Sequence, residues 1–197
     1  MKNKKIVFIL IPLFVLIVFF LNFNRQEEAQ EFYYIATLNG IRIPLSEYKL
    51  YLREQIISFE SIGGGTYIWK TNFDGIPAQV VAKQRALDAI IFVKLIIEYA
   101  DIIGVYLTPE DKKEAVLNAE ILFDSFTPQE RQDIDFYVVV NTMKEMILQT
   151  KVFDEITRNY TLEEERAEVF HHIYELWLQD AEIEKNIQVW DSIIIIP

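Results

Sequence analysis

The side chains best suited to bind a metal or transfer a proton are two adjacent histidines near the C-terminus. His172 follows Glu168 by four residues, and His171 precedes Glu175 by four. This spacing places two ligands on one face of a helix, as in helical metal sites. Adjacent helical residues, however, point about 100° apart, so the two histidines cannot share a site. Each pair supplies only two ligands, and we expect exposed side chains and no bound metal.

The other patterns that suggest chemistry are explained more simply by structure. Glu163, Glu164 and Glu165 lie at a predicted helix start, where the helix dipole favours negative charge. The three consecutive glycines at 63–65 lack the Lys-Ser/Thr pair of a phosphate-binding loop and predict a hinge. The chain contains no GxSxG motif. The sequence therefore predicts no catalytic residue, no cofactor and no nucleotide.

Five aromatic residues are the best candidates for a binding surface. Tyr67, Trp69 and Phe73 lie in a glycine-flanked loop, and Phe123 and Phe126 end a predicted helix. One interpretation is that they cover the core, as most large apolar side chains do. The other is that they line an apolar cleft that binds extended or unfolded polypeptide. The sequence leaves both interpretations open.

Residues 1–24 form a separate unit at the N-terminus. Lys2, Lys4 and Lys5 precede an uncharged run from Ile6 to Phe23, which contains 18 residues. As a helix this run is about 27 Å long, close to the roughly 30 Å of a bilayer core. No small-residue cleavage site follows it. We predict an uncleaved, single-pass anchor with a cytoplasmic N-terminus and the remainder on the extracytoplasmic side; a cleaved signal peptide and a secreted domain are the alternative.

The remainder of the chain is acidic and the whole chain lacks cysteine. All 30 acidic residues follow the anchor, and the net charge of the chain is −11. A basic surface for nucleic acid is therefore not expected. Without cysteine there is neither a disulfide nor a lipidated N-terminal cysteine, so the core alone must hold the fold.

After a short tether at 25–31, the sequence predicts one domain over 32–197. Asn39-Gly40 between apolar runs predicts a β-hairpin, followed by a helix over about 45–61 and a loop to Gly75. A second helix extends from Pro77 to Gly104. It is apolar almost all round over 89–97, so we expect it to be the central helix.

The second half of the domain is predicted to be helical up to a short β-segment at the end. Capping boxes that begin at Thr108, Thr127 and Thr161 predict helices over about 109–125, 128–159 and 161–179. Alternating residues at 181–186 predict a strand that pairs with the N-terminal hairpin, because an isolated hairpin is marginally stable. One or two short strands close the chain. The expected fold class is mainly α, with a small antiparallel β element.

Two segments in this order resemble the SurA/PrsA group of extracytoplasmic chaperones. They are IATLNGIRIPLSEY at 35–48 and RALDAIIFVKLIIEYADIIGVYLTPED at 85–111. The tail AEIEKN is similar to the strand that ends the chaperone domain in that group. The resemblance covers about residues 35–186. It implies a SurA N-terminal-type domain that binds unfolded or newly exported polypeptides.

The chain also departs from that group. Most members carry a parvulin-type prolyl isomerase domain, and here the chaperone elements use the whole chain. PrsA-type lipoproteins have an anchoring cysteine, which this sequence lacks. We therefore expect a membrane-anchored chaperone without isomerase activity. The alternatives are a non-catalytic interaction scaffold in a membrane assembly and a divergent peptidyl-prolyl isomerase.

Overall fold

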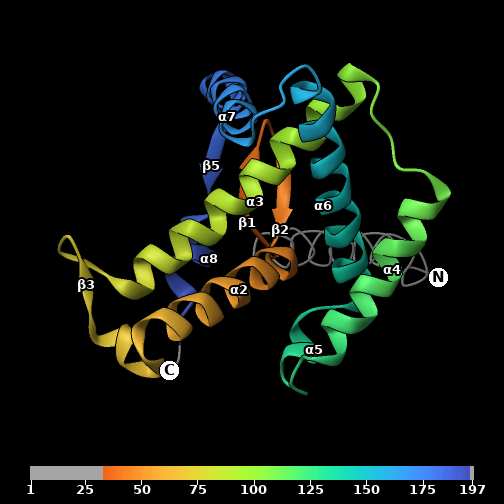
Figure 1. Ribbon diagram of the computed structural model, residues 1–197. Helices are drawn as coiled ribbons and strands as arrows, with labels where there is room; N and C mark the ends of the chain where they lie inside the picture. Colours follow the sequence, from red (N-terminus) through yellow and green to blue (C-terminus); the bar gives the residue numbers. More distant parts are fainter. Residues whose placement is uncertain (1–32, 196–197) are drawn as a thin grey trace, which may run out of the picture.

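Helix α3 (Ala78–Ile103) runs through the middle of the structure, a computed structural model that describes residues 33–195 (Figure 1). Ile90, Ile91, Val93, Leu95 and Ile96 are all buried. Since successive helical residues point about 100° apart, these positions face in several directions, and the helix must be covered on several sides. The prediction of a central helix is confirmed. The predicted anchor and tether lie outside the described residues, and within 33–195 no helix has the length and apolarity needed to cross a membrane.

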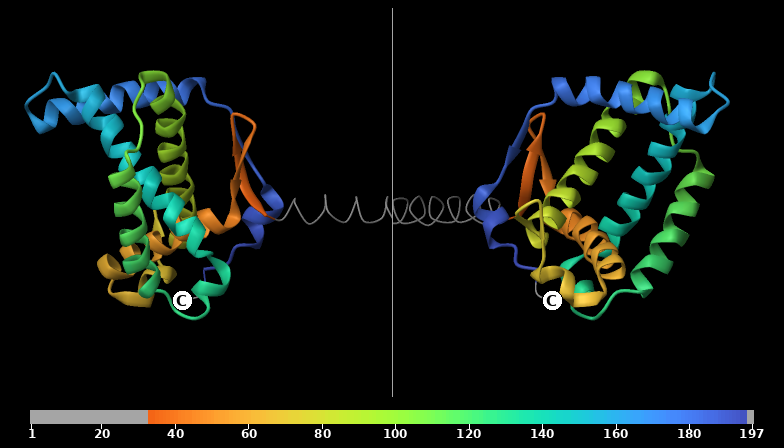
Figure 2. Two further views of the ribbon diagram at one scale, coloured as in Figure 1. Left: turned by 90° about the vertical axis from the view of Figure 1, so that its right-hand side faces the viewer. Right: turned by 60° about the vertical axis from the view of Figure 1, so that its left-hand side comes forward.

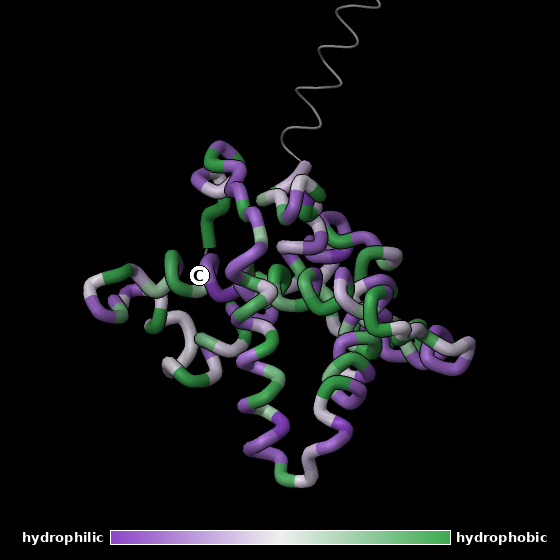
Figure 3. The backbone as a smooth tube through the Cα atoms, turned by 90° about the horizontal axis from the view of Figure 1, so that it is seen from above, coloured by the Kyte–Doolittle hydropathy of each residue, from purple (hydrophilic) through white to green (hydrophobic). Residues whose placement is uncertain are grey.

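The other long helices surround α3. Helices α2 (Leu45–Gly63) and α6 (Phe136–Thr157) pack against it, and α4 (Pro109–Asp124) packs against α6. Helix α7 (Glu163–Asp180) lies across the ends of α3 and α6 (Figure 2). Hydrophobic and hydrophilic residues are interleaved along the helices (Figure 3), as expected where one face of a helix packs on a core.

A three-stranded antiparallel sheet joins the two ends of the described chain. Its strands are β1 (Tyr34–Leu38), β2 (Ile41–Pro44) and β5 (Ile183–Lys185), in the order β2-β1-β5. Asn39 and Gly40 both have positive φ, 50° and 76°, which two-residue hairpin turns of this kind require. The Asn39 amide N–H donates to the carbonyl of Glu182 at 2.8 Å. The structure thus confirms a mainly helical fold with a small antiparallel sheet, including the pairing of the C-terminal strand with the hairpin.

The tail after β5 is a short helix and not a second strand. Asn186 caps α8 (Ile187–Ser192), and Val189 and Ile195 are buried in the main core. Lys83 of α3 donates from Nζ to the carbonyl oxygens of Trp190, at 2.6 Å, and Ile193, at 3.2 Å. Burial lowers the pKa of Lys83. This lysine fastens the end of the chain to the central helix.

Two of the three predicted capping boxes form. The hydroxyl of Thr108 accepts from the Asp111 amide, and the carboxylate of Asp111 accepts from the Thr108 amide. Thr127 and Glu130 make the same reciprocal pair. The prediction for Thr161 is wrong, because α7 begins at Glu163 without a side-chain cap.

The single helix predicted over 128–159 is interrupted. Helix α5 (Glu130–Asp133) ends at Ile134, whose backbone is extended and whose side chain is only 2% exposed. The carboxylate of Asp135 then accepts from the Tyr137 amide at 2.6 Å and starts α6. Two helices, α5 and α6, therefore stand where one continuous helix was predicted, and the buried Ile134 and the Asp135 cap separate them. The predicted loop after α2 is also partly ordered, as a 3-10 helix η1 (Gly65–Lys70) and the strands β3 (Asn72–Phe73) and β4 (Ile76–Pro77).

Deleting residues 181–197 should destabilise the whole domain cooperatively. The deletion removes β5, one of the two partners of β1, and two buried side chains, Val189 and Ile195. Burial of each such side chain is worth about 1.5–3 kcal/mol. Urea unfolding followed by circular dichroism measures the loss. The control is Ile194→Ser, a change at an exposed position in the same tail. Equal midpoints for the deleted and full-length chains would contradict the role of the tail.

Candidate functional site

A partly buried cluster of three charged side chains joins helices α2, α3 and α6. The Nζ atom of Lys94 lies 2.6 Å from Glu47 Oε1 and 2.6 Å from Glu145 Oε1. Only the contact with Glu145 has the geometry of a hydrogen bond, so Glu47 is held by charge. One cation therefore stands between two carboxylates, and the cluster carries excess negative charge.

Burial strongly perturbs the ionisation of this cluster. It raises the pKa of Glu145 from its ordinary 4.5 to about 7, with a further contribution from the charge of Glu47, while Lys94 acts in the opposite direction. Burial alone would lower the pKa of Lys94, but the charge and hydrogen bond of Glu145, together with the charge of Glu47, raise it above its ordinary value. The ammonium group of Lys94 thus stabilises the negative charge of both carboxylates.

Two hydroxyl groups beside this cluster are buried without hydrogen bonds. Tyr51 Oη on α2 and Thr142 Oγ1 on α6 have no hydrogen-bond partner within residues 33–195, nor does Glu145 Oε2. Burial raises the pKa of Tyr51, and the carboxylates of Glu145 and Glu47 raise it further. Buried polar atoms normally have partners. These atoms depart from that pattern.

One cleft is lined by this cluster, and a second is lined by the two hydroxyl groups beside it. The first, which we call the hairpin cleft, has a volume of about 450 Å³ and lies between the hairpin and helices α3 and α6. Its apolar lining is Leu38, Ile41, Ile43, Pro44 and Ile97, and its charged lining is Arg42, Glu47, Lys94, Glu98, Asp101 and Glu145. The second cleft, of about 360 Å³, lies between α2 and α6 and is lined by Leu50, Tyr51, Glu54, Leu122, Thr142, Met143 and Met146. Both volumes are typical of ligand-binding clefts.

The hairpin cleft offers a ligand several kinds of binding interaction. It combines an apolar wall with four carboxylates and two cations. No histidine, serine or threonine is among the described residues that line it. Apolar burial, ion pairing and hydrogen bonding are the interactions it offers a ligand.

The structure divides the five aromatic candidates into packing and surface residues. Trp69 is only 7% exposed; its ring stacks on Phe59, with centroids 5.8 Å apart, and its indole N–H donates to Glu60. Phe126 is also buried, and Phe123 is half-buried beside it, with ring centroids 5.3 Å apart. In this conformation Trp69 and Phe126 serve the core and present no surface to a ligand.

Tyr67 and Phe73 remain available at the surface. Tyr67 is 73% exposed and Phe73 41%. The elements around them also expose several aliphatic side chains that the sequence did not single out, namely Ile57, Ile62, Ile76 and Val80. Phe73 lies directly opposite Ile76 in the β3–β4 pair. The client-binding prediction for the loop therefore rests on Tyr67 and Phe73.

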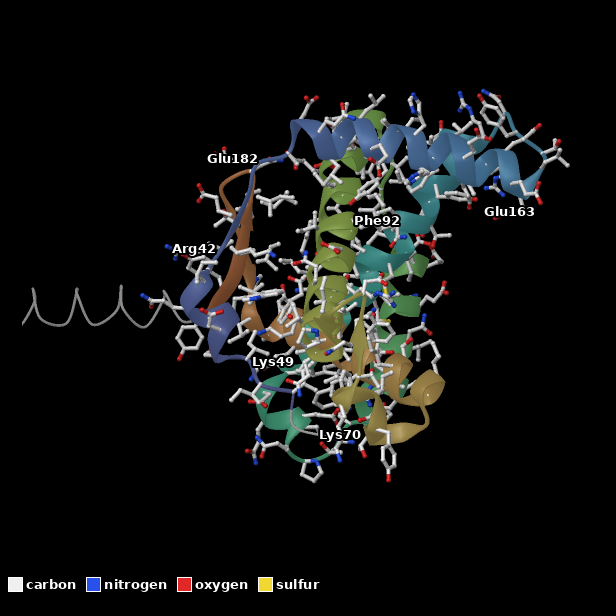
Figure 4. All side chains as sticks on the ribbon, turned by 90° about the vertical axis from the view of Figure 1, so that its left-hand side faces the viewer. Arg42, Lys49, Lys70, Phe92, Glu163 and Glu182 are labelled. Carbon is white, nitrogen blue, oxygen red and sulfur yellow. The ribbon has the colours of Figure 1, made fainter. Side chains whose placement is uncertain are left out.

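The two histidines do not line either cleft. His171 and His172 are exposed on α7, and His171 Nε2 is 3.8 Å from Glu175. Among residues 33–195 no group of three or more potential ligands gathers at one point. The inner face of α7 is instead aromatic: Phe92 of α3 lies beneath it (Figure 4), with its ring centroid 4.7 Å from that of Tyr174.

The buried charges were not anticipated, although the sequence carried a signal. Lys94 interrupts an otherwise apolar run at 89–97, and a lysine in a helix that is buried all round needs an acidic partner. The partners Glu47 and Glu145 have no local signature. Their proximity follows only from the packing of three helices.

Replacing Glu145 should flatten the dependence of stability on pH. An acid whose pKa is raised on folding binds its proton more tightly in the folded state, so its contribution to stability falls as pH rises from 4.5 through about 7. We expect Glu145→Gln to reduce the loss of unfolding free energy between about pH 5 and 8. Urea unfolding across this range tests it, with Glu120→Gln on the exposed surface of α4 as control.

Acidic side chains whose pKa is lowered on folding change the stability only below about pH 5. Hydrogen bonds from Lys151 and Thr108 lower the pKa of Asp111 below its ordinary 3.8, so its effect appears only at more acidic pH. If Glu145→Gln and the control lose stability with the same slope between pH 5 and 8, Glu145 is not the group responsible.

The two kinds of aromatic residue should respond differently to truncation. We expect Trp69→Ala to lower the unfolding free energy by about 3–5 kcal/mol, because it leaves a cavity against Phe59. Tyr67→Ala, at an exposed position of the same segment, should change it by less than about 0.5 kcal/mol. Thermal and urea unfolding of both variants measure this, and equal losses would contradict the assignment.

Comparison of the chain with protein-family models, with curated protein sequences and with solved structures gave no match. The resemblance to the SurA/PrsA group therefore remains a prediction from two sequence segments. The function has to be argued from the site itself.

Proposed function

We propose that this protein is an extracytoplasmic chaperone, anchored by residues 1–24, whose domain binds extended segments of unfolded, newly exported polypeptides. It needs no cofactor or nucleotide, and it has no isomerase activity. The proposal is supported by the SurA/PrsA-like segments at 35–48 and 85–111 and, in the structure, by the hairpin cleft.

The lining of the hairpin cleft is the observation that carries this proposal. On one side its lining follows strand β2 from Ile41 to Pro44, and on the other it follows α3 from Lys94 to Asp101. Eight helical residues extend over about 10 Å, which matches about three residues of extended polypeptide. A cleft of this length, with an apolar wall and charged groups, can receive a short extended segment.

The exposed loop adds a second surface of the same character. Tyr67 and Phe73 lie near exposed aliphatic residues at the far end of α2 and the start of α3. Exposed apolar groups of this kind contact unfolded polypeptides through their own apolar side chains. The two surfaces together would hold different parts of one client.

The alternatives have less support from the site. Parvulin-type isomerases use histidines, and both histidines here are exposed on α7 and absent from the lining of the hairpin cleft. A fixed-partner scaffold would use the same exposed apolar residues, but it would select one folded protein. The experiment below separates these outcomes.

Full-length protein in nanodiscs should suppress the aggregation of several unrelated, chemically denatured proteins. Ile41→Ser should weaken this binding about 3- to 10-fold, because Ile41 lines the cleft and is exposed, so its loss affects a ligand more than the fold. Leu117→Ser on α4 is the matched control at an exposed aliphatic position. Light scattering and fluorescence anisotropy provide the measurements.

Three results would contradict the proposal. They are a failure of the wild-type protein to suppress the aggregation of any client, equal effects of the two substitutions, and acceleration of proline isomerisation in a peptide assay. The last result would support the isomerase alternative.

A further inference from the structure

We infer that the hairpin cleft selects segments in which a lysine or arginine side chain is flanked by apolar residues. This inference rests on the proposed function and names the class of segment bound. It is carried by the arrangement of charge and apolar surface in the cleft.

Two carboxylates at the rim of the cleft have no cation of their own. Glu98 and Asp101 are exposed, lie one turn apart on α3, and make no ion pair within residues 33–195. Glu98 only accepts a hydrogen bond from the Asn39 side-chain amide, at 2.9 Å. Like charges at this spacing repel each other. A cation placed between them would remove that repulsion.

The cations already present in the cleft are engaged elsewhere. Lys94 is shared by Glu47 and Glu145 deeper in the site. The guanidinium of Arg42 lies over the ring of Tyr34, 4.9 Å from its centroid. Glu98 and Asp101 therefore leave the rim of the cleft negatively charged, which favours a cationic ligand.

The apolar wall fits the stem of the same side chain. Lysine and arginine carry long aliphatic stems that pack on apolar surface while the charged group stays in water. Ile41 and Ile97 line the cleft beside Glu98 and Asp101, and Ile41 is 68% exposed. A basic side chain can therefore cover these isoleucines and bring its charge to the two carboxylates. The neighbouring apolar residues of the segment would occupy the remaining wall.

The test uses full-length protein in nanodiscs of zwitterionic lipid and three fluorescent, unstructured peptides. The peptides are identical apart from a central lysine, glutamine or glutamate between leucine and valine residues. We expect the lysine peptide to bind about 5- to 10-fold more tightly than the glutamine peptide at low salt, and the glutamate peptide to bind most weakly. The preference should shrink at high salt, where exposed charges are screened.

Paired substitutions locate the preference. Glu98→Gln together with Asp101→Asn should reduce the preference for lysine over glutamine to less than about twofold. Glu165→Gln together with Glu168→Gln is the matched control, since it removes the same charge at the same spacing from the exposed surface of α7. The control should retain the wild-type preference.

The possible outcomes separate this inference from the proposed function. If the three peptides bind equally, the inference is overturned and the polypeptide-binding function stands. If the control pair abolishes the preference as fully as the cleft pair, the preference comes from the overall acidity of the protein, and the inference is again overturned. If none of the peptides binds and no denatured protein is held, both the function and the inference fail.

Discussion

Helix α3 is apolar around most of its circumference, and the other elements are arranged to cover it. Ile90 and Ile96 are fully buried, as is Leu87, and burying such a side chain contributes about 1.5–3 kcal/mol. Each side of α3 is covered by a different element, namely α2, α6, α7 or the C-terminal tail. This is why a largely helical chain returns at its end to the hairpin with which the domain begins. If any one of these covering elements were absent, part of α3 would face water.

Besides Lys83, which bonds to the C-terminal tail, α3 carries a second largely covered lysine, Lys94, and the candidate site is built around it. A buried ammonium group is tolerated only when it is paired, and the two carboxylates that pair with it come from different helices. The apolar covering of α3 is interrupted at this point by the hairpin cleft. Lys94 therefore takes part both in the packing of three helices and in the surface that we propose for binding.

Much of the architecture could be predicted from local sequence, while the site could not. Asn39-Gly40 specifies its turn, and the capping boxes at Thr108 and Thr127 specify helix starts, because the residues that interact are neighbours in the chain. The break at Ile134 depends on burial against residues from other helices. Likewise, Trp69 is a packing residue only because Phe59 reaches it from α2. The contact of Lys94 with Glu145 joins positions far apart in sequence, for which no local spacing gives a signal.

The position of β1 between β2 and β5 also governs when the domain can complete its folding. Asn39 and Glu182, which bond at the junction of these strands, are 143 positions apart. At a synthesis rate of about 5–20 residues per second, roughly 7–30 s separate their emergence from the ribosome. Throughout that interval one edge of β1 has no partner, and the core lacks Val189 and Ile195. An unpaired strand edge is prone to aggregate. A nascent chain of this protein therefore cannot complete its sheet and core until β5 and the helix after it have been made.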